Sequence, residues 1–255
     1  MKDLISRIQK FRLLDDTFMS TVFEKDIELA QLVLDIILEE KNLTVVSVET
    51  QKEFKTVTGR SAIFDIYAVD KDKKPYNIEV QRDDRGAIPE RARYYASILD
   101  TYSLDNGQNY DKIPESYIIF ITENDVLGKG LPLYHIERKV VETNELFNDR
   151  MHIIFVNGAY TKTDDKLGKL IHDFKCEDPN QMYNNVIANK VNYFKNEKGG
   201  LDYMCKIMET YGKEREDERA KENAINMLRD NLPLEKVVKY SGLSLEEVVA
   251  LKNNL

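Results

Sequence analysis

The feature that most constrains this chain is a pair of alternating stretches, residues 61–70 and 75–82, separated by four charged residues. Two strands joined by so short a polar loop are expected to form an antiparallel hairpin. Side chains alternate between the two faces of a strand, so the apolar positions identify the buried face. These positions are Ala62, Phe64, Ile66 and Ala68 in the first stretch and Tyr76, Ile78 and Val80 in the second.

The register of this hairpin brings two acids together. A three-residue loop centred on Asp72 keeps both apolar faces on one core and places Asp65 opposite Glu79, with Gln81 on the same face. Opposed carboxylates on adjacent strands lie ~5 Å apart at Cβ and repel each other. Mg²⁺ prefers oxygen ligands and is commonly held by one or two carboxylates. The hairpin therefore predicts a Mg²⁺ site at Asp65 and Glu79, with Mn²⁺ as the other candidate ion.

Such a site is suited to phosphodiester hydrolysis, because a bound metal acidifies water and orients the scissile phosphate. Gln81 would position the water or a phosphate oxygen, since an amide is not an effective general acid or base. The alternative interpretation is that Asp65 and Glu79 are solvated residues on the outer face of an edge hairpin. Ile63 and Tyr67 flank Asp65 on its own face, and this favours partial burial and a compensating ion.

The rest of the chain predicts an α/β fold in which a mixed sheet is covered by helices, with a helical C-terminal extension. The β-branched and apolar runs indicate further strands, and the longer runs with helical periodicity indicate helices. The expected elements are one or two helices over 16–37 broken near Lys25–Asp26, a strand over 43–50, a helix over 89–104, buried strands over 117–121 and 153–156, and helices after 164.

The C-terminal part differs in composition from the rest. Residues 212–223 are mostly charged without an apolar stripe, which predicts an exposed helix or a linker. We therefore expect a domain over 1–210 and a small helical tail over 211–255. Residues 234–248 resemble a helix-turn-helix, but Glu246 and Glu247 at the front of its second helix are unfavourable for DNA contact and favour a protein-contact or capping role.

Charge and cysteine content exclude several classes of protein. A net charge of −8 argues against strong non-specific affinity for nucleic acid, which depends on lysines and arginines. Two distant cysteines support neither a disulfide framework nor a Cys-rich zinc site. No segment is apolar enough for a secretory signal or a membrane span, so we expect a cytoplasmic protein.

Four segments together resemble a known family. They are Asp15-Asp16-Thr-Phe-Met-Ser-Thr-Val-Phe23, the Asp65…Glu79-x-Gln81 hairpin, Arg91-Ala-Arg-Tyr-Tyr95 and the stretch 117–130. From about residue 12 to residue 210 the chain is similar to the PD-(D/E)XK nuclease family transposases, which are related to recombination-promoting nucleases. Phe64 stands where the superfamily has its proline, and Gln81 stands in place of the usual lysine.

The resemblance implies a restriction-endonuclease-like core and Mg²⁺-dependent DNA cleavage, with Asp65 and Glu79 as metal ligands and Gln81 in the catalytic set. An acid from the first helix often completes such sites, which points to Asp16, and less to Asp15. Asp16 has a second interpretation as the cap of a helix that begins at Thr17.

Several alternatives stay open for partners and activity. Arg91 and Tyr94 are candidates to contact DNA, although ion pairing on a solvated surface explains the arginine equally well. The predicted function is a DNA endonuclease acting in transposition or recombination, with RNA as another conceivable substrate. The alternative is a catalytically weak or inactive nuclease fold that binds DNA or a protein. A homodimer would help such an enzyme to cut both strands.

Overall fold

The predicted hairpin is present at the centre of the sheet. In the computed structural model, which describes residues 2–40, 42–56 and 59–255, β2 (Ala62–Asp70) pairs antiparallel with β3 (Pro75–Gln81). Ile66 lies opposite Ile78, and Val69 lies opposite Pro75. This is the register predicted from the apolar faces, and it brings Asp65 level with Glu79 just beyond the last of these pairs.

Six strands in the described part of the chain form one mixed sheet in the order β1-β2-β3-β4-β6-β5. β3 pairs parallel with β4 and β4 with β6, whereas the other neighbours are antiparallel. Every residue of β4 is buried, as expected for a strand covered on both faces. The remaining strands are β1 (Val45–Phe54), β4 (Ser116–Thr122), β5 (Leu133–Ile136) and β6 (Met151–Asn157).

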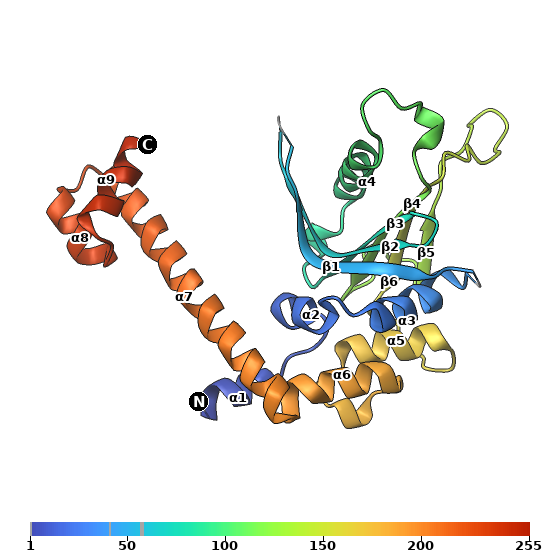
Figure 1. Cartoon of the computed structure of the whole chain (residues 1–255), viewed down its shortest axis with the longest axis horizontal. Coiled ribbons are helices and arrows are strands. Elements are labelled where there is room, and N and C mark those ends of the chain that lie inside the picture. Colours follow the sequence, from blue (N-terminus) through green and yellow to red (C-terminus); the bar gives the residue numbers. More distant parts are fainter. Residues whose placement is uncertain (1, 41, 57–58) are drawn as a thin grey trace.

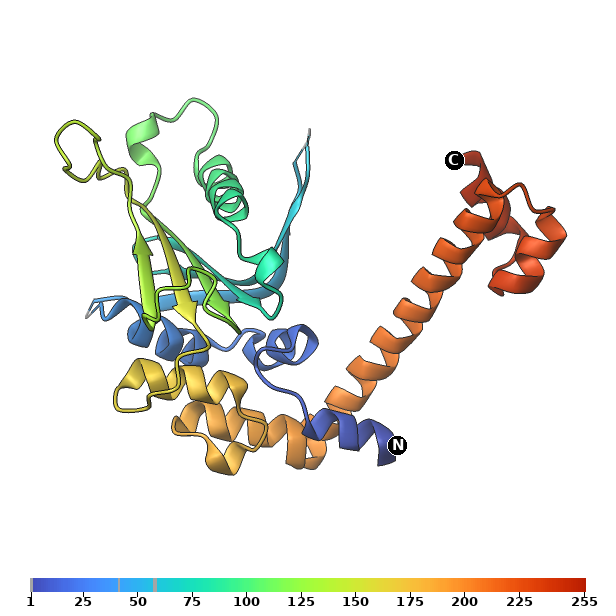
Figure 2. The same ribbon diagram turned by 180° about the vertical axis from the view of Figure 1, so that it is seen from behind.

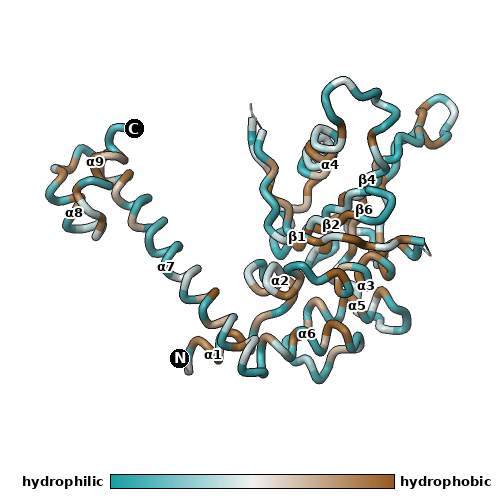
Figure 3. The backbone as a smooth tube through the Cα atoms, viewed as in Figure 1, coloured by the Kyte–Doolittle hydropathy of each residue, from teal (hydrophilic) through white to brown (hydrophobic). Residues whose placement is uncertain are grey.

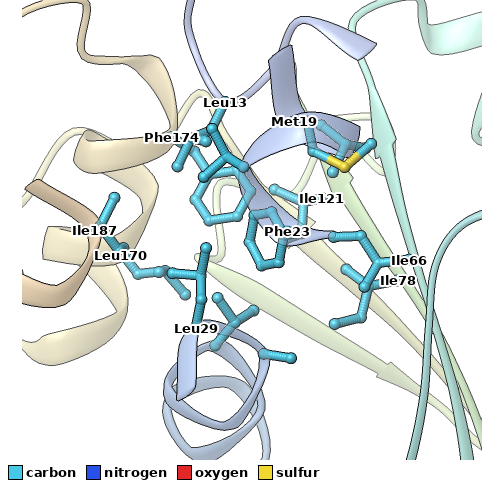
Figure 4. Packing of buried hydrophobic residues seen from close by; sticks show 14 of the residues in the cluster. Leu13, Met19, Phe23, Leu29, Ile66, Ile78, Ile121, Leu170, Phe174 and Ile187 are labelled. Carbon is cyan, nitrogen blue, oxygen red and sulfur yellow. The ribbon is translucent and has the colours of Figure 1, made fainter. Parts of the chain in front are cut away.

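Helices cover both faces of this sheet (Figure 1). The larger core packs on one face against α2 (Asp16–Phe23), α3 (Ile27–Leu38), α5 (Lys166–Lys175) and α6 (Asn185–Asn196). Figure 4 shows Phe23 and Phe174 from this helical layer beside Ile78 and Ile121 of the sheet. A second core lies on the other face, where α4 (Pro89–Ser103) packs against β2 and β4 through residues such as Tyr95 and Phe120. The predicted α/β architecture is confirmed.

The helical region near the N-terminus is interrupted where the sequence predicted. Lys25 has a positive φ of 56°, and the side chain of Asp26 then caps α3 by accepting a hydrogen bond from the Leu29 N–H at 3.0 Å. Further along the chain, the fully buried Lys195 of α6 donates to the carbonyl oxygens of Gln9 and Phe11. These bonds fix the segment that leads into α2.

The C-terminal part is a long helix with two short helices at its far end (Figures 1 and 2). α7 (Lys198–Arg229) continues through residues 212–223, so the charged segment is an exposed helix and not a flexible linker. Its C-terminal half is largely hydrophilic in Figure 3. The expected boundary between 210 and 211 falls inside this helix, and the division into two domains stays a prediction.

The tail has the predicted pattern of helix, glycine turn and capped helix. Gly242 ends α8 (Leu234–Ser241) in the left-handed region at φ 76°, and Ser244 forms a capping box with Glu247 at the start of α9 (Leu245–Asn253). The two helices pack on the end of α7 in a small core of their own. This core contains Ala224, Val237, Leu243 and Val248.

Short elements complete the chain. α1 (Lys2–Gln9) contacts α7, and 3-10 helices span Asp84–Gly86, Tyr110–Lys112 and Pro179–Gln181. Within the described ranges, none of the helices combines the length and the apolar character needed to cross a membrane.

Candidate functional site

The carboxylates of Asp65 and Glu79 approach each other where the pairing of β2 and β3 ends. Oε1 of Glu79 accepts a hydrogen bond from the backbone N–H of Asp65 at 3.3 Å, and Oδ2 of Asp65 accepts one from the backbone N–H of Val80 at 2.9 Å. Each acid is thus fixed by the backbone of the opposite strand. Glu79 is fully buried, whereas Asp65 is half-buried.

Gln81 lies beside this pair, as alternation along β3 requires. Its Nε2 atom is 3.5 Å from Oδ2 of Asp65, and its Oε1 atom accepts from Nη1 of Arg91 at 3.1 Å. A Cβ atom at Gly86 would lie 2.0 Å from Oε1 of Gln81, so only glycine leaves room for the amide in this position. The three hairpin side chains therefore share one place in the structure, while their catalytic roles stay predictions.

Arg91 in the first turn of α4 points into the site. Its Nη2 atom donates to Oε2 of Glu79 at 2.9 Å, and its Nε atom donates to the Tyr95 hydroxyl at 2.8 Å. The remaining donor, Nη1, serves Gln81 and the carbonyl oxygen of Gly86. The arginine is 30% exposed and makes an ion pair with the fully buried Glu79, so its partner is an acid of the site and not one on a solvated surface. Its contact with DNA stays a prediction.

A fifth side chain, which the sequence did not identify, links the hairpin to α2. Nε2 of Gln51 in β1 donates to Oδ1 of Asp16 at 2.8 Å and lies 3.5 Å from Oδ1 of Asp65. α2 begins at Asp16 itself and has Asp15 as its N-cap residue, so the expectation that Asp16 caps a helix beginning at Thr17 is wrong. The Asp16 carboxylate is turned to the sheet and not to its own helix.

Ion pairs fix the start of α2 against the ends of two strands. Arg82, which follows β3, pairs with Asp15 and with Glu123, which follows β4. Arg12 completes the set with a 2.7 Å bond to Glu123. Asp15 is therefore used in this network, and Asp16 is the acid of α2 that is linked to the hairpin through Gln51.

The electrostatics of the site disfavour its own negative charges. Burial is the main cause that raises the pKa of Asp65 to about 6; the charge of Asp16 also raises this pKa, whereas the Val80 N–H, Arg91 and Gln51 lower it. Burial also raises the pKa of Glu79, with the charge of Asp65 as the next cause, and Arg91 offsets this only in part. For Asp16, burial again raises the pKa, and the hydrogen bond from Gln51 lowers it. The Arg91 guanidinium thus offsets the charges of Asp65 and Glu79 only in part, and Asp16 has the uncharged Gln51 as its partner.

A cavity of about 640 Å³ opens over Asp65 and Gln51. Arg60, Arg85 and Arg91 contribute to its walls, together with Tyr94, whose hydroxyl donates to the carbonyl oxygen of Arg60. Tyr94 is 37% exposed at this surface. Asp65 is accessible from the cavity, whereas Glu79 lies behind Arg91.

The donor set fits a divalent cation held by two carboxylates. Asp65 and Glu79 supply oxygen ligands only, and their charges are incompletely compensated, which are the conditions that favour Mg²⁺ or Mn²⁺. In the parts of the chain described here, no group of three or more His, Cys, Asp or Glu side chains is arranged to hold a metal. Water and substrate phosphate would therefore supply the other ligands, and Glu79 would exchange Arg91 for the ion.

Comparison with protein families shows to which family the chain belongs. A family model described as PD-(D/E)XK nuclease family transposase matches residues 24–232. The chain belongs to this family. The match covers the hairpin and α4, extends through α7 beyond the expected limit near residue 210, and begins after Asp16. No match was found among curated proteins or among solved structures.

Proposed function

We propose that this PD-(D/E)XK family protein is a metal-dependent endodeoxyribonuclease that hydrolyses phosphodiester bonds during transposition or recombination in the cytoplasm. The observation that supports this most directly is the meeting of Asp65 and Glu79, each bonded to the backbone of the other's strand, beside a cavity with arginines in its wall. Burial raises the pKa of both acids, so the fold disfavours the charged form of this pair when no cation is bound. A bound cation would compensate these charges.

Each residue of the site has a defined part in this proposal. Asp65 and Glu79 would hold Mg²⁺, or Mn²⁺, which supplies Lewis acidity and a more acidic water when bound. Gln81 would orient the attacking water or a phosphate oxygen through its amide, since it cannot remove a proton. Asp16 would be the further acid of the site. Arg91, once released from Glu79, and Tyr94 would contact the DNA backbone at the cavity.

The test is cleavage of supercoiled plasmid DNA in Mg²⁺ by the wild type and by Asp65→Ala and Glu79→Ala. We expect nicking by the wild type and a loss on the order of 100-fold or more in each variant, because metal stabilisation is worth several kcal/mol. Asp72→Ala is the matched control, since Asp72 is an exposed acid at the tip of the same hairpin. Wild-type protein that does not cut, or variants that cut as well as the wild type, would contradict the proposal.

A second candidate function is a DNA-binding or protein-interaction module without efficient cleavage. The observation in its favour is that Arg91 donates hydrogen bonds to Glu79 and Gln81, where a metal would have to bind. In addition, position 81 is a glutamine and not the usual lysine. This candidate predicts Mg²⁺-independent binding of labelled duplex DNA without cleavage, measured by fluorescence anisotropy. Light scattering of the protein with and without DNA would test the further prediction of a homodimer that cuts both strands.

A further inference from the structure

Gln51 has an unusual backbone conformation for a strand residue. Its φ is 51°, in the left-handed region that residues with a Cβ atom rarely adopt, although it lies within β1. β1 bends along its length toward α4 (Figure 1). Backbone strain of this kind persists where the surrounding structure compensates for it, often at functional sites.

The position of Gln51 relative to the acids suggests what the strain achieves. Thr50 lies opposite Ile66, and Lys52 lies opposite Phe64, so Gln51 is level with Asp65 on the neighbouring strand. The left-handed conformation interrupts the alternation of β1 at this position. As a result the amide lies between the carboxylates of Asp16 and Asp65, with Nε2 at 2.8 Å and 3.5 Å from them.

The chemistry of the contact requires an amide donor. Ionised carboxylates are acceptors only, so two of them cannot approach each other without a donor or a cation between them. The amide group has two N–H donors and carries no charge. It can therefore bridge the two carboxylates and leave their negative charges available to a metal ion. A lysine or arginine here would compete with the ion, and a carboxylate would add to the repulsion.

We propose that Gln51 is a positioning residue that holds the carboxylate of Asp16 on the Asp65 side of α2, so that this acid lies next to the metal site formed by Asp65 and Glu79. The inference rests on the proposed metal-dependent function. Two further observations agree with it. Gln51 lies in the wall of the cavity, and the ion pair between Asp15 and Arg82 holds the start of α2 near the hairpin. The proposal also implies that the site draws on three elements, β1, α2 and the β2–β3 hairpin.

The first test is calorimetric titration of the full-length protein with Mg²⁺. Gln51→Leu removes the donor at similar size, and we expect its affinity for Mg²⁺ to fall about 10-fold, as for groups that orient metal ligands. Asp16→Ala should weaken binding similarly, and the double variant should be no weaker than Asp16→Ala alone, because Gln51 acts through Asp16. Unchanged affinity in Gln51→Leu, or fully additive losses, would overturn the inference.

The second test separates positioning from a merely structural role. Gln51→Gly relieves the left-handed strain, so we expect its thermal midpoint to rise by about 2–4 °C while its affinity for Mg²⁺ falls as in Gln51→Leu. Lys73→Gly is the matched control: Lys73 has φ 65° in the hairpin turn, and this variant should gain stability without losing affinity. Stability and affinity that fall together at position 51 would contradict positioning.

The third test remains informative if the proposed function fails. Should the wild type neither bind Mg²⁺ nor cleave DNA, the nuclease proposal is wrong, but the link between Gln51 and Asp16 can still be measured in metal-free buffer. Denaturant unfolding of Gln51→Leu, Asp16→Ala and the double variant should then show non-additive effects on the midpoint. Additive effects would mean that the contact does not position Asp16, whatever the protein does.

Discussion

Asp65 shows how a residue suited to the proposed function lowers the stability of the metal-free protein. The folded state binds its proton more tightly than the unfolded chain does, because the pKa of Asp65 is raised by burial and by Asp16. A carboxyl group of this kind contributes stability below its unfolded pKa and loses it as pH rises through the folded value. For Asp65 this window runs from 3.8 to about 6. Ionisation of Asp65 therefore destabilises the metal-free folded protein near neutral pH.

We accordingly expect Asp65→Asn to be more stable than the wild type in EDTA at pH 7.5, on the order of 1–2 kcal/mol, and nearly equal at pH 4. An asparagine can still accept the hydrogen bond of the Val80 N–H, while the repulsion by Glu79 and Asp16 disappears. Denaturant unfolding at the two pH values measures the difference. With Mg²⁺ the order should reverse, since the wild type alone retains the ligand. A variant less stable than the wild type in EDTA at pH 7.5 would show that the acids are not in conflict.

The sequence predicted the hairpin residues of the candidate site, but not the contacts that Gln51 and Arg91 make with its acids. Asp65, Glu79 and Gln81 belong to one hairpin, and alternation with a short loop is enough to bring them together. Gln51 comes from a strand whose bend at a left-handed residue leaves no local sequence signal. The ion pair of Arg91 depends on how α4 docks on the sheet, and this is decided by packing across many residues.

The same distinction holds for whole elements. β2, β3, β4 and β6 were predicted because each has alternation or a continuous apolar run. β5 (Leu133–Ile136) was missed because four residues at the edge of the sheet carry no pattern. β1 continues to Phe54, past the predicted end at residue 50, because it goes on pairing with β2; residues 51–53 are polar, so the sequence carries no signal for this extension.

Attachment of α4 to β3 depends on the ion pair between Arg91 and Glu79, which gives a prediction at the level of the element. Arg91→Met leaves the fully buried Glu79 carboxylate without a cation, so we expect a loss of about 2–3 kcal/mol at pH 8. The loss should be smaller at pH 5, where Glu79 is protonated because its pKa is raised. Arg93→Met, an exposed change on the same helix, should stay within about 0.5 kcal/mol of the wild type.

Urea unfolding curves of the two variants at pH 5 and pH 8 provide the measurement. Equal losses at both pH values would indicate that Arg91 stabilises α4 by packing on Tyr95, whose ring lies 4.9 Å from the guanidinium carbon, and not through its charge. Arg91→Lys should lie between the wild type and Arg91→Met, because an ammonium group cannot serve Glu79, Gln81 and Tyr95 at once.

At the scale of the whole molecule, α7 connects the large core beneath the sheet with the small core of the tail. Residues of α7 near its beginning, such as Met204, belong to the large core beneath the sheet, whereas Ala224 near its end belongs to the small core of α8 and α9. Between them the helix is mostly exposed. Few contacts therefore transmit stability from the tail to the site, apart from the continuity of α7 itself.

Val237→Asp should for this reason unfold the tail and leave the rest intact. The substitution places an unpaired charge in the small core, where Val237 is fully buried. We expect α8 and α9 to become sensitive to limited proteolysis, while the main thermal transition and the Mg²⁺ affinity stay as in the wild type. Tyr240→Asp, on the same helix but 59% exposed, should remain resistant. A lower main transition in Val237→Asp would mean that residues 211–255 fold with the nuclease domain as one cooperative unit, and the predicted boundary would be wrong.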